Sequence, residues 1–292
     1  MLWGIISIFV IGLRNIGFSS LQIVAIRAVV TALLFVIFVS FTDISLLKIK
    51  LRDIKYFIGT GILSIAFFNW CYFTAIQKTS VSVAAILLYT APAFVTILSR
   101  FLFKEWFTYK KIISLAGTFI GCAFVVGLLP ATRLSVSFAG MLIGLGAGFG
   151  YALYSIFGKY ALLKYRPITV TTYTFLIASI GLLPISEIWE AHALFSKAKV
   201  WLYGSGLVLF STVLAYSLYT FGLSHVESSR ASIMATIEPL VATLVGAIFF
   251  AQSLTIWQIL GILLIIAAVI MIQEKQKMTP SAANVPAKSS RF

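Results

Sequence analysis

Ten apolar runs follow one another along this 292-residue chain, separated by short connections that hold most of its charge. Only 10% of the residues are charged, against about 25% in a soluble domain, so a soluble globular fold is excluded. A helix needs about 20 apolar residues to cross a bilayer; nine of the runs are long enough and the first is short. The pattern predicts an all-α polytopic membrane protein. The runs are Leu2–Leu13, Leu21–Thr42, Ile54–Ile76, Ser82–Phe103, Ile112–Leu129, Phe138–Leu163, Ile168–Ile188, Trp201–Leu223, Ser229–Ala251 and Ile256–Ile272.

The Lys and Arg residues are unevenly divided between alternate connections. With the amino end in the cytoplasm, sixteen fall on the inner side and five on the outer side, while Arg27 lies inside a span. Because cytoplasmic connections carry an excess of Lys and Arg, we expect both termini to be cytoplasmic. The net charge of +14 therefore reflects membrane insertion, and no nucleic-acid partner is expected.

The two halves of the chain resemble each other at an offset of 147 residues. Ser82 then matches Ser229, Pro92 matches Pro239, and Tyr72 matches Tyr219. Five spans in each half make the second half enter the membrane from the opposite side, which is an inverted repeat. The basic Arg100 matches the neutral Ala247, as opposite topology requires.

These features predict ten transmembrane helices arranged as two inverted five-helix repeats. The first repeat is expected over 1–130, the second over 131–273, and a disordered cytoplasmic tail over 274–292. The sixth span begins near Phe138, so its counterpart is expected to begin about ten residues before Met1. The first helix is thus expected to be truncated.

Several short motifs resemble the drug/metabolite transporter superfamily, specifically its EamA-type members with ten spans in two repeats. They are Leu2-Trp3-Gly4, Ala25-Ile26-Arg27, the segment from Tyr72 to Ala85, the Ala91-Pro92 and Glu238-Pro239 pairs, and Phe103-Lys104-Glu105. The corresponding place in the second repeat reads Ala251-Gln252, so a charge there is expected to be dispensable. The resemblance implies a transporter that binds its solute near the bilayer midplane between the repeats.

Glu238 is the sharpest candidate for a functional residue. It lies about ten residues into the ninth span, where an ionised carboxylate costs about 2.5–3.5 kcal/mol on insertion scales. One interpretation is a proton-coupling site or a site for a substrate ammonium group. The other is a protonated carboxyl that is hydrogen-bonded to a neighbouring helix.

Pro92 and Pro239 lie in the middle of matching spans. A proline ring frees the carbonyl four residues earlier, here at Leu88 and Ala235. Such carbonyls can bind a cation and such kinks can act as hinges, although a static bend is equally compatible with the pattern.

A second group of candidates combines polar and aromatic side chains inside spans. Asn69 matches Tyr216 across the repeat, as a midplane pocket between pseudo-symmetric halves would need. Aromatic walls are expected from Trp3, Tyr89, Tyr151 and Tyr154, either around a solute or as plain packing, and Tyr219, which matches Tyr72, is a further candidate. Arg27 is expected to anchor the second span at the headgroups, with substrate contact as the alternative.

No cofactor or metal is expected, because His192 and His225 have no carboxylate or Cys partner at ligand spacing. The sequence favours a secondary active transporter that moves small metabolites, such as amino acids or amphiphilic compounds, by export or exchange, with protons as a candidate coupling ion. Its place would be the bacterial cytoplasmic membrane. The alternative is an intramembrane enzyme acting on a lipid-linked substrate.

Overall fold

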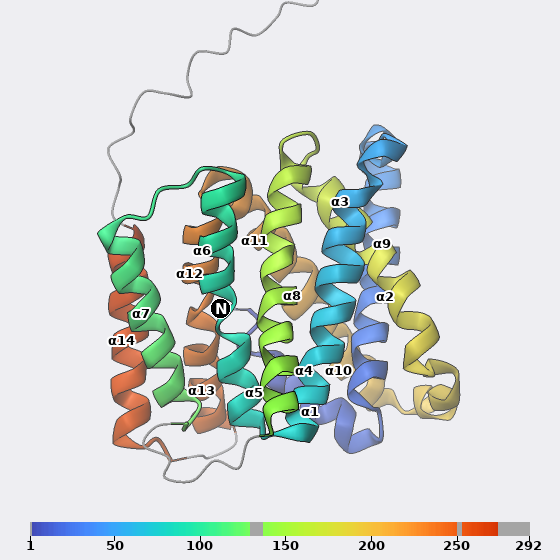
Figure 1. The fold of residues 1–292 in the computed structure, drawn as a ribbon. Coiled ribbons are helices and arrows are strands. Elements are labelled where there is room, and N and C mark those ends of the chain that lie inside the picture. Colours follow the sequence, from blue (N-terminus) through green and yellow to red (C-terminus); the bar gives the residue numbers. More distant parts are fainter. Residues whose placement is uncertain (1, 129–136, 250–252, 274–292) are drawn as a thin grey trace, which may run out of the picture.

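The computed structural model describes residues 2–128, 137–249 and 253–273 as a helical bundle (Figure 1). The first half of the chain supplies the elements α1 (Ile6–Ile16), α2 (Ser20–Thr42), α3 (Ile54–Ile58), the π-helical η3 (Gly59–Ala66), α4 (Phe67–Lys78), α5 (Val81–Leu88), α6 (Ala91–Leu102) and α7 (Tyr109–Val125). The second half supplies α8 (Phe138–Leu162), α9 (Pro167–Ser186), α10 (Ala198–Val208), the π-helical η5 (Leu209–Leu214), α11 (Ala215–His225), α12 (Ser228–Ala235), α13 (Ile237–Phe249) and α14 (Ile256–Gln273).

Short 3₁₀ segments join some of these helices. They are η1 (Ile44–Leu47) and η2 (Leu51–Asp53) between α2 and α3, and η4 (Ile188–Ser196) between α9 and α10. The predicted tail over 274–292 and the Ala251-Gln252 pair lie outside the described residues, as does any start before Met1.

Eight helices in the described part of the chain are long and apolar enough to cross a membrane. The two remaining expected spans are shorter, with 11 residues in α1 and 17 in α7. The all-α membrane fold is confirmed. Of the ten predicted crossings, eight are formed by helices long enough to span a membrane. Large apolar side chains cover the outside of the bundle, including Leu33, Phe101, Ile180 and Ile248, which are each more than half exposed. In a bilayer these side chains would meet lipid.

The two halves repeat the same helical plan. The bounds of α5 and α12 differ by 147 residues at both ends, and each helix has eight residues. The ends of α4 and α11 and the starts of α7 and α14 differ by the same number. Both long third spans also contain a π-helical segment, η3 in the first half and η5 in the second. Equivalent helix boundaries at one constant offset confirm two five-helix repeats.

Side-chain caps start several helices in the short connections. Ser19 and Gln22 form a reciprocal capping box at the start of α2. Ser80 Oγ accepts from the Val83 amide at 3.2 Å, and Ser137 Oγ accepts from the Gly140 amide at 3.0 Å. These caps satisfy backbone donors that no intrahelical carbonyl reaches.

Both matched prolines coincide with a break between two helices. α5 ends at Leu88 and α6 begins at Ala91, with Pro92 in its first turn. In the second repeat, α12 ends at Ala235 and α13 begins at Ile237, two residues before Pro239. Because proline lacks the amide donor that would continue the preceding helix, it fits naturally in the first turn of a new one. Their role as hinges stays a prediction.

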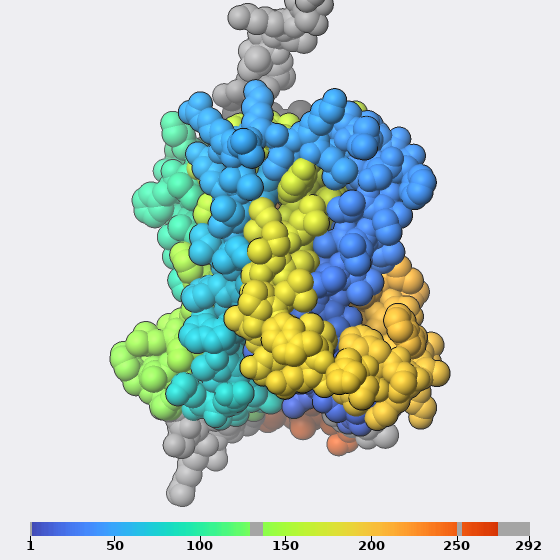
Figure 2. All heavy atoms as spheres, turned by 90° about the vertical axis from the view of Figure 1, so that its right-hand side faces the viewer, coloured from blue at the N-terminus to red at the C-terminus, as the bar shows by residue number. Residues whose placement is uncertain are grey.

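Small residues set the closest helix contacts. α7 packs against α14 through Gly121 and Gly261: a Cβ atom added to Gly121 would lie 2.9 Å from the Gly261 carbonyl oxygen. A Cβ atom on Gly148 of α8 would lie 2.6 Å from the Leu87 carbonyl oxygen. Any larger residue would push these helices apart. On another face, α9 packs between α2 and the third span (Figure 2).

The two ends of the bundle differ in charge. The connections 43–53, 103–108, 163–166 and 226–227 meet at one end, together with most of the Lys and Arg residues; we call this the basic end (Figure 1). The connections 17–19, 79–80, 187–197 and 253–255 meet at the other, which we call the opposite end.

Candidate functional site

A small cavity lies where the helix breaks of the two repeats meet. Glu238 and Thr236 line it from the second repeat, while Tyr89 and Pro92 line it from the first, with Tyr151 of α8 beside them. We call it the acidic cavity. Its volume is about 10 Å³, room for about one water molecule. Leu88 and Ala235, whose carbonyls the prolines were expected to free, also line it. The structure thus brings together Glu238, Tyr89, Tyr151 and Pro92.

A second cavity of about 10 Å³, the aromatic cavity, adjoins the first and shares Tyr151 with it. The Trp3 ring lies 5.1 Å from the Tyr216 ring and 5.2 Å from the Tyr219 ring, measured between centroids. The Tyr219 hydroxyl is 2.7 Å from Ser155 Oγ. The predicted aromatic residues Trp3, Tyr151, Tyr216 and Tyr219 therefore meet in one cluster. The Trp3 indole nitrogen is buried and no partner for it lies among the described residues.

Asn69 lies apart from these two cavity linings. It is buried in α4, and its amide nitrogen donates to the Ile65 carbonyl of the same helix at 2.7 Å. Tyr72, one turn further along, interacts electrostatically with Glu238 instead. Sequence comparison paired Tyr72 with Tyr219 but did not select it. Because Tyr72 interacts with the Glu238 carboxyl from the first repeat, it is a better candidate than Asn69 for a residue of the site.

Arg27 corrects an expectation. Its side chain is 8% exposed, and the guanidinium carbon lies 6.0 Å from the centroid of the Tyr216 ring. Arg27 also interacts electrostatically with Glu238. The anchoring interpretation is therefore wrong: α2 is rotated so that Arg27 faces the interior of the bundle.

A wider hollow, the vestibule, leads from the acidic cavity toward the opposite end. Its volume is about 290 Å³, and Tyr89 lines both spaces. Pro239 and Thr243 of α13 and Gln258 of α14 form the far wall. Tyr89 therefore separates the vestibule from Glu238.

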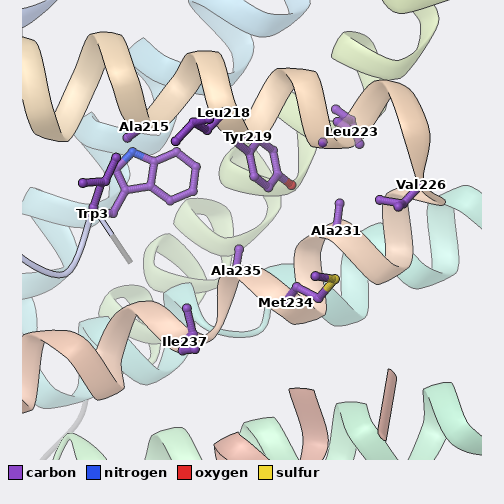
Figure 3. Close-up of a pocket in the computed structure, with 12 residues that line it drawn as sticks. Trp3, Ala215, Leu218, Tyr219, Leu223, Val226, Ala231, Met234, Ala235 and Ile237 are labelled. Carbon is purple, nitrogen blue, oxygen red and sulfur yellow. The ribbon is translucent and has the colours of Figure 1, made fainter. Parts of the chain in front are cut away.

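An apolar groove opens on the second repeat between α11 and the pair α12–α13 (Figure 3). Its volume is about 350 Å³, and it shares Trp3 and Tyr219 with the aromatic cavity. Figure 3 shows Tyr219 and Met234 reaching into it from opposite walls. We call it the lateral groove. Each of the four spaces shares lining residues with a neighbour, and together they surround Glu238 and the aromatic cluster.

Sequence reasoning missed a buried polar cluster at the basic end. The Glu105 carboxylate accepts from the Ser228 amide at 2.7 Å, from the Ser229 amide at 3.2 Å and from the Ser229 hydroxyl. Lys111 Nζ lies 3.6 Å from Glu105 Oε2 and 3.0 Å from Glu227 Oε2. We call these five residues the latch.

The latch joins the two repeats, since Glu105 and Lys111 flank the start of α7 while the other three begin α12. Lys111 is 1% exposed. Lys104, with φ 56°, turns the chain after α6 so that Glu105 points back into the bundle. The available sequence signal was the mismatch of Lys111 with Gln258 across the repeat. In the part of the chain that the structure describes, no group of three His, Cys, Asp or Glu side chains could hold a metal ion.

The inverted helical repeats with cavities at their junction define the class as a membrane transport protein. A model of the EamA-like transporter family matches residues 1–127 and 138–273, and the chain belongs to this family.

Several similar proteins are named as transporters. An uncharacterized transporter from Archaeoglobus fulgidus is 33% identical over 275 residues, covering 93% of this chain and 92% of that protein. The threonine/homoserine exporter RhtA of Escherichia coli K12 is 27% identical over 208 residues, covering 70% and 67%. A solved crystal structure shares the fold with a TM-score of 0.76 at 15% identity, covering 93% of this chain and 92% of that one.

Proposed function

We propose that this protein is a secondary active transporter that exports or exchanges a small metabolite by alternating access. The observation that carries this proposal is the acidic cavity, where Glu238 sits between the broken helices of two inverted repeats. Repeats that rock about such a junction can expose one site to each side of a membrane in turn. The relatives are named as transporters, which supports transport over an enzyme acting on a lipid-linked substrate.

The substrate we propose is an amino acid or a small amphiphilic cation. Carboxylate chemistry at Glu238 suits an ammonium group, and the rings of Trp3, Tyr151 and Tyr216 suit both cations and flat apolar groups. One relative is named a threonine/homoserine exporter. That name makes amino acids the first substrates to test.

We assign the basic end, at which α14 ends, to the cytoplasm; α1 begins inside the bundle (Figure 1). The excess of Lys and Arg at this end supports the assignment. Single cysteines at Lys164 and Lys197, which lie at opposite ends, test it in intact bacterial cells. An impermeant maleimide is expected to label the Lys197 position only. Labelling of the Lys164 position alone would reverse the assignment.

Protons are the coupling ion we propose, taken up and released at Glu238. Among the described residues, the titratable and charged groups that interact electrostatically with this carboxyl are Tyr72, Tyr89, Cys122, Tyr151, Tyr216 and Arg27. A carboxyl inside a membrane can neutralise by binding a proton, which lowers the cost of moving the site through the apolar interior.

Uptake into proteoliposomes tests the proposal. The parent protein is expected to accumulate a labelled amino acid or cationic dye when a pH gradient is imposed, and Glu238→Gln is expected to abolish that accumulation while retaining exchange. Glu190→Gln, an exposed position in η4, is the matched control. Full pH-driven accumulation by Glu238→Gln would exclude proton coupling at this residue.

A further inference from the structure

Two side chains of opposite charge face the same buried aromatic cluster from different helices. Glu238 of α13 lines the acidic cavity, and Arg27 of α2 lies against the Tyr216 ring, which lines the aromatic cavity. Tyr151 lines both cavities and interacts electrostatically with both charged side chains. Glu238 and Arg27 thus lie on either side of two adjoining cavities that Tyr151 separates.

Each charge is costly where it lies, because insertion of Arg, Lys or Asp at the centre of a membrane helix costs about 2.5–3.5 kcal/mol. Arg27 is 8% exposed and is held against an aromatic ring instead of reaching the surface of the bundle. A guanidinium presents a planar fork of donors that matches a carboxylate with two parallel hydrogen bonds. A carboxylate at Glu238 accepts from an ammonium group.

We propose that Arg27 is a specificity-determining residue that binds the carboxylate of a zwitterionic solute while Glu238 binds its ammonium group. This inference rests on the proposed function and narrows the substrate class to α-amino acids. Tyr216 covers Arg27 in the present state and gives way to the solute carboxylate on binding. The solute side chain then points past Trp3 and Tyr219, which also border the apolar lateral groove.

Binding in this way requires the site to expand. The acidic and aromatic cavities hold about 10 Å³ each, less than any amino acid. Space becomes available when α12 and α13 move away from α8, because Tyr151 of α8 closes the gap between the two cavities. In the present structure the charged groups are in place, and rings fill the space between them.

Competition in counterflow experiments tests this assignment. Proteoliposomes carry the full chain and exchange labelled threonine against unlabelled threonine, its decarboxylated amine or its deaminated hydroxy acid. The parent protein is expected to prefer threonine over both analogues. For Arg27→Gln, the preference for threonine over the amine is expected to fall at least about tenfold, since a charge-assisted hydrogen bond is lost, while competition by the amine is unchanged.

Two further variants distinguish recognition from a structural role. Arg27→Lys keeps the charge and is expected to recover part of the preference for threonine. Arg14→Gln, at an exposed position near the end of α1, is the matched control and is expected to leave all three affinities unchanged. Size-exclusion chromatography shows whether each variant remains folded.

The outcomes separate this inference from the proposed function. Equal losses of threonine and amine affinity in Arg27→Gln would assign Arg27 a structural role and overturn the inference. Exchange of amines or dyes without any preference for zwitterions would overturn it too, yet leave transport intact. No exchange of any solute by the folded parent protein would overturn both.

Discussion

The bundle has two equivalent corners, one at each end. At each corner the eight-residue helix of one repeat meets helices of the other repeat, but the two corners are closed differently. At the basic end, α12 packs against α6 and α7, and the latch joins them through Glu105 and Lys111. At the opposite end, the equivalent α5 packs little against α13, and the vestibule lies between them. Gln258, which replaces Lys111, donates to the Val125 carbonyl at 3.3 Å.

Under the proposed alternating access, this difference would favour one of two tilted states over the other. Two inverted repeats with identical contacts would favour neither end. Ion pairs stabilise the contact between the repeats at one corner, whereas the other corner, where the neutral Gln258 stands, has a hollow of about 290 Å³. The latch thus joins the repeats at the basic end, and the vestibule hollows the opposite end as far as Tyr89.

The largest expected effect comes from breaking the latch. Glu105→Ala removes the acceptor of three donors at the start of α12 and is expected to destabilise closure of the basic end by about 3 kcal/mol, the lower end of the range for a broken buried pair. The effect stays low in that range because Lys111 keeps Glu227 at 3.0 Å. A single cysteine at Ser232, 3% exposed, should then become reactive toward reagents added from the basic end. Unchanged reactivity would show that packing alone closes this end.

A second change builds a latch at the opposite corner. Ser80→Glu with Gln258→Lys reproduces the Glu227–Lys111 pair in the other repeat, at positions 147 residues apart from the originals. The new pair should favour closure over the vestibule and slow exchange several-fold, since an exposed pair contributes up to about 1 kcal/mol. Labelling of a cysteine at Thr243, which lines the vestibule, measures the closure. Each single variant serves as a control, and faster labelling in the double variant would contradict the expectation.

A smaller effect is expected at the turn that aims Glu105. Lys104 has φ 56°, a left-handed conformation that costs a non-glycine residue about 1 kcal/mol. Lys104→Gly should therefore raise thermal stability slightly and leave the latch intact, whereas Lys104→Val should lower it. Melting curves in detergent, with Lys110→Gly inside α7 as a control that should be destabilised, check the assignment. Destabilisation by Lys104→Gly would show that the lysine side chain matters more than the backbone.

The smallest effect concerns a pair at the surface of the basic end. Lys164 Nζ lies 2.5 Å from Asp53 Oδ1, and this hydrogen bond raises the pKa of Lys164 above its ordinary value of 10.5. Because the pKa of Lys164 is raised in the folded state, the stabilisation that the Lys164–Asp53 pair contributes is fully present below pH 10.5. It is lost as the pH rises through the pKa of Lys164 in the folded state. The melting temperatures of Lys164→Met and the parent should differ slightly at neutral pH and converge in strong alkali. A difference that grows with pH would have the wrong sign.

The helices and the repeat were predictable because both are local properties of the chain. Long apolar runs become helices wherever backbone groups cannot bond to water, and the offset of 147 residues between Pro92 and Pro239 reappears in the helix bounds. The aromatic group around Trp3 follows from the aromatic residues inside the spans, whereas symmetry alone did not select it, because Tyr216 matches Asn69 across the repeat. Asn69 obeyed the same symmetry, yet its amide bonds to Ile65 within its own helix.

What only the tertiary structure decided is where charges face and which ends are closed. Nothing near Arg27 in the sequence indicates that it lies against Tyr216, 189 residues away, because the rotation of α2 depends on all the helices packed around it. In the sequence, Glu105 is likewise one more charge in a basic loop. Only the fold places the first amides of α12 beside its carboxylate. The sequence by itself determined the order, position and pairing of the helical units, since apolar length and repetition suffice for that. Burial of a charge depends on contacts between distant segments, so only the folded chain decided which carboxylates and cations became parts of the site and the latch.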